Sequence, residues 1–441
     1  MSSDGNKADP DLVTAPTEGD SEPEKLVSGH LHLRNLVRAF RHPNYRLYFF
    51  GMAISLTGTW MQNAAEGWLV YELTSSEFHL GLTRFLHSIP VTLFTLIGGH
   101  FADHFNKRRI LVTTQFVSLT LALTLGSLAL TGVVQFWHIA ALAMALGLAQ
   151  AFDIPARQSF IIDIVGKKDL MNAIAMNASI FNGARVIGPA IAGILIAMPA
   201  VGVAGCFFLN GLSFLAVIVS YLLMKLPPAK PHPNPKSLRR GMSEALKHVR
   251  GDRVLLTFIM LVATFSLFGW PYTVLMPAIA RDVLGVGAAG YGMLMSANGT
   301  GALLGALTVA TLGDYPHKKR VFFVGAFGFC ATVAIFAQST QFWMTAAILV
   351  AAGWFMLLFF STANTTVQLR VPDELRGRIM AIYSLGFIGL TPFGALLAGT
   401  AARQIGAGTT LTIGACICGV ATALATVALK GQLTSRAKDG D

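Results

Sequence analysis

Four ionisable side chains lie inside long apolar runs of the sequence, where a charge is costly and therefore informative. Glu66 and Arg84 stand in two consecutive runs, Arg185 lies near the middle of a later run, and Asp153 lies nearer the end of its own. Residues of this kind bind ions or polar ligands, carry protons, or hold neighbouring helices together. They are the first candidates for chemistry in this chain.

Glu66 and Arg84 each stand about five residues from the end of an apolar run, so the helical rise puts them at similar depth. This predicts an ion pair between the two side chains. The pair has two interpretations that the sequence leaves open, a structural link between neighbouring helices and a proton-linked or gating role.

Arg185 lies about thirteen residues into its run and has no acidic residue at its depth. An unpaired cation there is best stabilised by an anionic or carbonyl-rich ligand, so we interpret it as a substrate-binding residue. The alternative is an arginine bonded to Asn63, Gln62 or helix carbonyls. Polar and aromatic residues at comparable depth complete the candidate binding set, although each could instead hold helices together: Gln62, Asn63, Asn182, Trp270, Tyr272 and Asn298.

A short charged stretch between apolar runs occurs twice. Asp103 is followed by Lys107-Arg108-Arg109, and Asp314 is followed at the same spacing by Lys318-Lys319-Arg320. A single loop of this kind usually only fixes topology. Two copies indicate an internal repeat, an arrangement common in secondary transporters.

Composition places the chain in a membrane. Of 441 residues, 54% are hydrophobic and 12% are charged, about half the charged fraction of a soluble domain. The net charge of +11 would suggest nucleic acid in a soluble protein, but here the cations lie in loops and indicate orientation in the bilayer, so no nucleic-acid partner is expected. Cys416 and Cys418 point to different sides of a helix, and neither a disulfide nor a metal site is expected.

Twelve apolar runs are each long enough to cross the bilayer as a helix. The expected spans are 46–71, 79–102, 109–132, 136–157, 171–198, 201–225, 254–280, 287–313, 319–338, 341–366, 377–403 and 407–429. Lys and Arg concentrate on one side of these spans, which predicts that both termini are cytoplasmic. The predicted fold is all-α, with two pseudo-symmetric bundles of six transmembrane helices.

The composition divides the chain into six segments. They are a disordered acidic cytoplasmic tail (1–30), an amphipathic juxtamembrane segment (31–45), an N-terminal six-helix bundle (46–225), a cytoplasmic central loop (226–253), a C-terminal six-helix bundle (254–430) and a cytoplasmic tail (431–441).

Several motifs resemble the major facilitator superfamily over about residues 42–430. Gly99-x-x-x-Asp103 before Lys107-Arg108-Arg109 is similar to the signature of its loop 2–3, although His104 and Asn106 depart from the usual residues. The stretches 153–158, 177–193 and 371–378 resemble the branch that includes the bacterial enterobactin exporters. The Gly183, Gly188-Pro189 and Gly193 pattern is similar to the antiporter motif of the superfamily, which implies export.

The resemblance also implies contacts at the cytoplasmic face. We expect Asp103 to lie near Arg157 and Arg378 in an outward-open state, and Asp314 to lie near Arg370. The residues assigned to coupling or gating are Glu66, Arg84, Asp103, Arg108, Asp153, Arg157, Asp314 and Arg370.

We therefore predict a monomeric secondary transporter of the cell (inner or plasma) membrane, exporting a drug- or siderophore-like organic compound in exchange for protons. The alternatives are an uptake symporter and a non-transporting membrane receptor or scaffold. No Walker-type phosphate loop and no catalytic constellation occurs in the sequence, so neither a nucleotide-driven motor nor an enzyme is expected, and no cofactor is implied.

Overall fold

The computed structural model describes residues 38–225, 238–312 and 318–434, and within these ranges the regular structure is helical throughout. The predictions for the acidic tail and for Asp314 lie outside the described residues. Ten helical segments are long and apolar enough to cross a membrane. The chain is thus a multi-pass membrane protein.

The first part of the chain forms five long helices after a short 3₁₀ turn, η1 (Arg38–Arg41). They are α2 (Pro43–Thr74), α3 (Glu77–His104), α4 (Lys107–Leu130), α5 (Phe136–Ala197) and α6 (Gly202–Leu223). The 62 residues of α5 comprise two helices that meet at Gly166, whose φ of 70° suits glycine because it has no Cβ. We call α2 to α6 the N-terminal helices.

The later part forms α7 (Leu238–Gly251) and then the C-terminal helices. Four of these are uninterrupted, and the first three are α10 (Ala288–Leu312), α11 (Lys318–Gln338) and α12 (Phe342–Arg370). The last helix, α15, covers Ala407–Thr434. Two further membrane segments are interrupted.

The expected helix over 254–280 is not continuous. It is divided into α8 (Arg253–Thr264), η2 (Phe265–Gly269), η3 (Trp270–Thr273), α9 (Met276–Ala278) and η4 (Ile279–Val283). Pro271 and Pro277 lack the N–H that an α-helix needs, which accounts for the change of helical winding. The segment 376–405 is divided in the same way into α13 (Arg376–Ser384), η5 (Leu385–Gly389) and α14 (Thr391–Ile405), with Pro392 at the second break.

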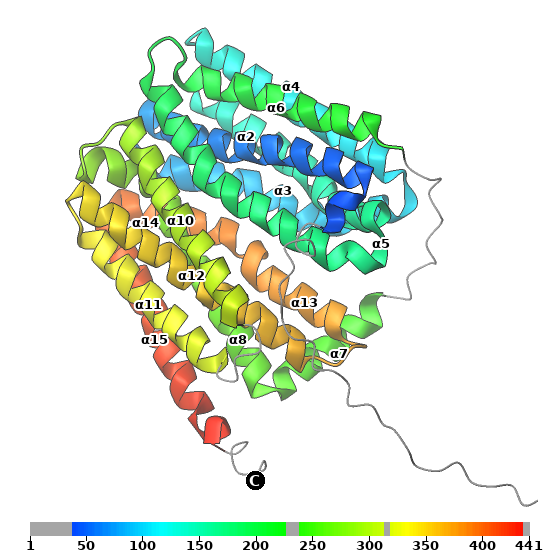
Figure 1. The fold of residues 1–441 in the computed structure, drawn as a ribbon. Helices are drawn as coiled ribbons and strands as arrows, with labels where there is room; N and C mark the ends of the chain where they lie inside the picture. The colour runs from blue at the N-terminus through cyan, green and yellow to red at the C-terminus, as the bar shows by residue number, and fades with distance from the viewer. Residues whose placement is uncertain (1–37, 226–237, 313–317, 435–441) are drawn as a thin grey trace, which may run out of the picture.

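The N-terminal helices pack chiefly on one another, as do the C-terminal helices, and Figure 1 shows the two sets on opposite sides of the molecule. Most contacts between the sets come from two helix pairs, α5 with α10 and α3 with α14. Glycines permit the close approach: a Cβ on Gly193 would lie 3.0 Å from the Cα of Gly292, and a Cβ on Gly81 would lie 3.1 Å from the Cα of Gly399. The helices therefore meet backbone to backbone at these points.

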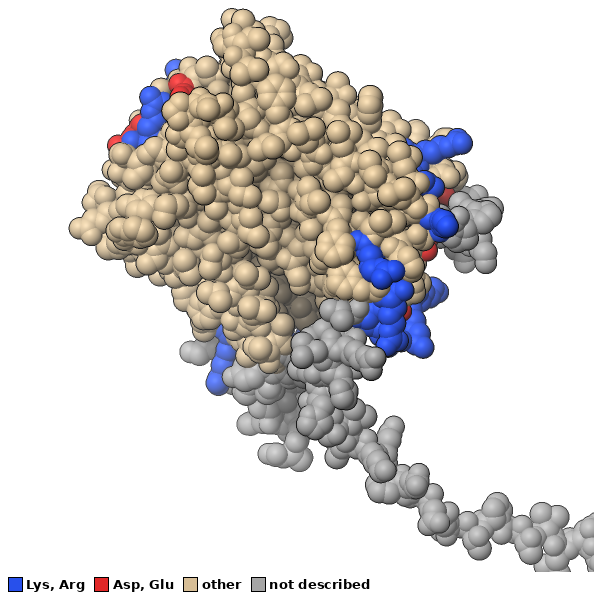
Figure 2. Space-filling model, turned by 45° about the horizontal axis from the view of Figure 1, so that its top comes forward, with Lys and Arg blue, Asp and Glu red and all other residues tan. Residues whose placement is uncertain are grey.

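Charged side chains divide the surface into bands. Figure 2 shows most of the blue Lys and Arg side chains gathered at one end, a smaller group of blue and red side chains at the other, and a broad tan surface between. We call the first end the basic end. At or just beyond the ends of their helices, it holds Lys107, Arg108, Arg109, Lys225, Arg370 and Arg376. Such a band pattern is what a bilayer-spanning protein presents.

Candidate functional site

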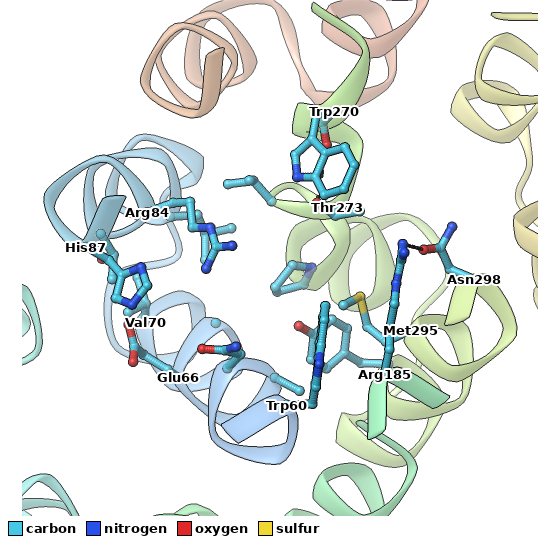
Figure 3. A pocket seen from close by; sticks show the side chains of 18 residues that line it. Trp60, Glu66, Val70, Arg84, His87, Arg185, Trp270, Thr273, Met295 and Asn298 are labelled. Carbon is cyan, nitrogen blue, oxygen red and sulfur yellow. Dashed lines mark hydrogen bonds between the residues drawn. The ribbon is translucent and has the colours of Figure 1, made fainter. Parts of the chain in front are cut away.

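A pocket lies between the two sets of helices. Its walls come from α2, α3, α5, η3, α9 and α10, and it holds about 950 Å³ of empty space, part of it open to solvent. Figure 3 shows the side chains that line it. Among the predicted site residues, the lining includes Asn63, Glu66, Arg84, Arg185, Trp270 and Asn298.

Arg185 links the two sets at the edge of this pocket. It is buried, with 7% of its surface exposed, and its Nη2 donates a hydrogen bond to Asn298 Oδ1 at 2.9 Å. The Nδ2 of Asn298 in turn donates to the hydroxyl of Tyr272 at 2.6 Å. The guanidinium also lies 5.8 Å from the ring centroid of Trp60, a cation–π distance. The structure thus brings three predicted binding residues into one network, although Tyr272 is fully buried behind Asn298 and does not itself line the pocket.

Small residues position Arg185 between two neighbouring helices. A Cβ on Gly188 would lie 2.6 Å from Trp60 Cβ, so α5 contacts α2 there, and a Cβ on Gly299 would lie 2.7 Å from the carbonyl oxygen of Arg185, so α10 contacts α5 there. Gly183, the first glycine of the antiporter-like pattern, has no such neighbour within 4 Å. The later glycines of the pattern therefore serve packing, and Gly183 does not.

Glu66 and Arg84 line the same pocket but do not form the predicted ion pair, because no N–O distance of 4.0 Å or less joins them. Helical rise predicted similar depth for the two residues, but it does not determine side-chain direction. Figure 3 shows Arg84 extending into the pocket from α3, away from the Glu66 carboxylate. The predicted ion pair is therefore wrong for this structure, although both residues line the pocket.

His87 lines the pocket but is not among the site residues predicted from the sequence. It lines the pocket with Arg84, and neither ring nitrogen has a hydrogen-bond partner among the described residues, although both are buried. One signal was available: His87 follows Arg84 by three residues and so lies on the same face of α3. Thr83 and Tyr291 also line the pocket and were not predicted.

Two predicted binding residues lie elsewhere. Gln62 is buried between helices, where its Oε1 accepts a hydrogen bond of 2.7 Å from Asn210 of α6. Asn182 donates to the carbonyl of Ala178 in its own helix at 2.8 Å. Neither lines the pocket. For Gln62 the reason is that adjacent helical residues point about 100° apart, so Asn63 faces the cavity and Gln62 faces α6.

At the end of the molecule opposite the basic end, polar groups also join the two sets. The hydroxyl of Tyr71 donates a hydrogen bond to the carboxylate of Asp282, and Arg281 donates to the Tyr71 carbonyl at 3.4 Å. Beside the Arg185 network, Ser296 of α10 donates to the carbonyl of Val186 of α5 at 2.7 Å, a further bond between the two sets. Together with the close approach of Gly193 to Gly292 and of Gly81 to Gly399, these bonds hold the two sets of helices together.

At the basic end, the predicted gating residues have other partners. Arg157 pairs with Asp153 at 3.5 Å, and Asp153 also accepts hydrogen bonds from Thr114 and Gln115. Asp103 is exposed and forms no ion pair with a described residue. Its contact with Arg157 was expected for a state closed at the basic end, and for that state it stays a prediction.

Two further basic residues are fixed within their own set. Arg108 donates to the carbonyl of Leu222, and Arg370 Nε donates to Asp252 at 2.6 Å. Partial burial raises the pKa of Asp252, but the hydrogen bonds from Arg370 and from two backbone amides outweigh this effect and leave that pKa below its usual range. The predicted partner of Arg370, Asp314, lies outside the described residues.

Comparison with known proteins agrees with this architecture. The staphyloferrin A transporter of Staphylococcus aureus is 24% identical to this chain, covering 83% of it and 91% of the relative. The multidrug efflux pump Tap of Mycolicibacterium fortuitum is 24% identical, over 82% of this chain and 89% of its own. The enterobactin exporter EntS of Escherichia coli is also 24% identical, over 83% and 87%.

Solved structures share the fold. A POT family transporter in complex with 5-aminolevulinic acid superposes with a TM-score of 0.71 at 12% identity, covering 89% of this chain and 97% of that one. A bacterial homologue of the human lysosomal transporter Spinster, inward-facing and unoccupied, gives 0.68 at 14% identity, covering 88% and 97%. At such identities the likeness concerns the fold alone.

A family model described as transmembrane secretion effector matches residues 37–438, nearly the whole chain. The protein belongs to this family of the major facilitator superfamily, and it is a transporter and not an enzyme.

Proposed function

We propose that the protein exports a small to medium organic anion across the cell membrane by alternating access, as a monomer and in exchange for protons. The observation that carries this proposal is the buried Arg185, which lies at the edge of the pocket and is bonded across the two sets of helices to Asn298. A ligand at this position contacts both sets at once. Such a site can be exposed alternately to the two sides of the membrane.

The charge of the pocket favours an anionic substrate. Its lining contains two arginines, Arg84 and Arg185, and a single acidic residue, Glu66. Arg185 is held by a neutral amide, so its charge is not cancelled by the described residues around it. The guanidinium presents several N–H groups in one plane, which suits a carboxylate or a similar oxygen pair.

The aromatic lining favours a substrate with a flat apolar part. Trp60, Trp270 and Tyr291 lie around the same space, and Met295 adds a flexible apolar surface. Ligand pockets of this kind take most of their affinity from apolar contacts and their orientation from a few polar groups. Relatives named for siderophore and drug transport are compatible with such a compound.

We further propose twelve membrane crossings with both termini in the cytoplasm. Two crossings are added to the ten apolar segments. One is α2, whose 32 residues are long enough to span the bilayer. The other comes from counting the two helices of α5, which meet at Gly166, as separate crossings. The concentration of Lys and Arg at the basic end supports a cytoplasmic location for that end. Since Tyr71 is hydrogen-bonded to Asp282 and Arg281 of the other set at the opposite end, we expect the described state to admit substrate from the cytoplasm.

Glu66 is our candidate for proton coupling. It is the only acid that lines the pocket, and it is not held by a cation within ion-pair distance among the described residues. A carboxylate that is accessible from the cavity can take up and release a proton as access alternates. This role stays separate from substrate binding, which we assign to Arg185.

Transport into and out of vesicles tests the proposal. The purified protein would be reconstituted and efflux of an anionic and a neutral compound panel measured, with and without a pH gradient. Arg185→Lys keeps the charge but loses the planar fork, and should raise the apparent KM for the anion by about tenfold, or about 1.4 kcal/mol.

Asn182→Ala is the matched control, because Asn182 lies on the same helix but outside the pocket. It should leave the KM unchanged. If a proton gradient makes the anion accumulate on the side where it was loaded, the protein is an uptake symporter. If the folded protein transports no compound at all, a receptor or scaffold is favoured. Either result, or normal transport by Arg185→Lys, would overturn the assignment.

A further inference from the structure

An apolar groove at the basic end is separate from the pocket. It runs between the end of α3, the first half of α4 and the middle of the first helix of α5, and it shares no lining residue with the pocket. Its walls include large apolar side chains that are exposed: Phe101 (41%), Phe105 (59%), Val117 (38%) and Leu148 (43%). All three helices belong to segments that can cross a membrane, so the groove opens towards lipid.

Aromatic contacts give the groove a defined wall. Phe101 stacks on Phe105 with ring centroids 5.1 Å apart, and it meets Phe152 of α5 edge to face at 5.6 Å. The three rings thus connect the end of α3 to α5. The wall is therefore built from packed side chains that support each other.

A single cation, Arg109, stands at the mouth of the groove. It is exposed, lines the groove, and has no side-chain hydrogen bond or ion pair with a described residue. Its neighbours differ, because Lys107 pairs with Asp163 at 2.7 Å and Arg108 donates to the carbonyl of Leu222. Of these three basic residues at the start of α4, Arg109 is the one whose side chain has no polar partner in the described part of the chain.

No acidic residue cancels this charge within the groove, since its lining contains neither Asp nor Glu. Asp103 is the nearest acid along α3, but it follows Phe101 by two residues. Two residues correspond to about 200° around a helix, so Asp103 points away from the side on which Phe101 lines the groove. The mouth is positive and the walls are apolar.

We propose that this groove binds an anionic phospholipid. The phosphate would contact Arg109 at the level of the headgroups, and one acyl chain would lie along α4 past Thr113 and Val117. Arg109 and Val117 are eight residues apart, a rise of about 12 Å, so the apolar wall continues well below the headgroup. Basic residues beside an apolar intramembrane surface are the combination that anionic lipids recognise.

Binding to the purified full-length protein tests this site. Phosphatidylglycerol and phosphatidylcholine with identical acyl chains would be titrated into detergent-solubilised protein and counted by native mass spectrometry. We expect phosphatidylglycerol to bind more tightly. Arg109→Gln should weaken phosphatidylglycerol about fivefold, or about 1 kcal/mol, and leave phosphatidylcholine unchanged.

Two further variants separate the parts of the site. Ala145→Trp fills the groove and should weaken both lipids, because Ala145 lines it. Arg46→Gln removes another exposed cation near the N-terminal end of α2, outside the groove, and should change neither. If Ala145→Trp does not fold, the effect of Arg109→Gln on phosphatidylglycerol binding alone tests the site.

Inorganic phosphate distinguishes a lipid site from a simple anion site. We expect millimolar phosphate not to displace phosphatidylglycerol, because phosphate lacks the chain that fills the groove. Displacement by phosphate, or equal binding of the two lipids to the unmodified protein, would refute the proposal. Unchanged selectivity in Arg109→Gln would refute it as well.

Discussion

Replacing Asn298 by Asp tests whether the charge of Arg185 is available to a ligand. In the structure, Asn298 Oδ1 accepts from Arg185 at 2.9 Å and its Nδ2 donates to the Tyr272 hydroxyl at 2.6 Å. Aspartate has the same shape, keeps an acceptor for Arg185, and can accept from the Tyr272 hydroxyl instead. The substitution therefore preserves the network and adds one negative charge beside Arg185.

The expected loss of affinity follows from Coulomb's law. A ligand anion bound by Arg185 would lie about 6 Å from the new carboxylate, and an effective dielectric constant of about 20 to 40 gives a repulsion of about 1.4 to 2.8 kcal/mol. This corresponds to a ten- to hundredfold weaker binding of the anion. A neutral analogue of the same compound should lose little, because it carries no charge to repel.

Intrinsic fluorescence provides a binding assay, since Trp60 and Trp270 both line the pocket. The anion and its neutral ester would be titrated against the unmodified protein, Asn298→Asp and Asn298→Leu. Asn298→Leu removes the hydrogen bonds without adding a charge, so it should affect the two compounds alike. Equal affinities of Asn298→Asp and the unmodified protein for the anion would refute our reasoning, as would an equal loss for anion and ester.

Three further predictions concern coupling, closure and pH. Glu66→Gln should leave anion binding within about twofold of the unmodified protein and weaken the dependence of transport on the pH gradient; lost binding with an unaltered pH response would contradict the role we give to Glu66. Tyr71→Phe removes the hydrogen bond to Asp282 and should raise, by about fivefold, the rate at which a cysteine introduced in the pocket reacts with a membrane-impermeant reagent from the side opposite the basic end; an unchanged rate would show that this bond does not hold the closed state. Asp252→Asn keeps the helix cap but loses the charge paired with Arg370. Because the folded pKa of Asp252 lies below its unfolded value of about 3.8, the pair stabilises the protein above that pH and loses its effect as the pH falls through the folded pKa. The melting temperatures of variant and unmodified protein should differ near neutral pH and converge in acid, and a constant difference would exclude this linkage.

Much of the fold could be predicted from the sequence because a bilayer imposes simple requirements. Apolar length identifies spanning segments, and the loops that carry Lys and Arg identify one end. The breaks at Pro271 and Pro277 were not predicted. Apolar length alone does not reveal them, since the interrupted segment is as hydrophobic as a continuous helix.

The sequence predicts how deep the site residues lie along their helices, but not the directions in which their side chains point. Arg185 is buried, as expected for a deep cation, and Asn298, which was expected only at comparable depth, is bonded to it. Their hydrogen bond depends on how α5 packs against α10, which no periodicity within either helix determines. For the same reason Glu66 and Arg84 were expected to pair, although each faces the pocket.

The interrupted segment from α8 to η4 has a mechanical consequence. Its far end carries Asp282, which holds Tyr71 of the other set, while its near end is tied through Asp252 to Arg370. Pro271 and Pro277 remove two backbone hydrogen bonds between these attachments, so the segment can flex there more easily than a continuous helix. Asp282 can then release Tyr71 while Asp252 stays bonded to Arg370. We therefore expect the contact between the two sets at Tyr71 to open by local bending of this segment, without moving all the C-terminal helices together.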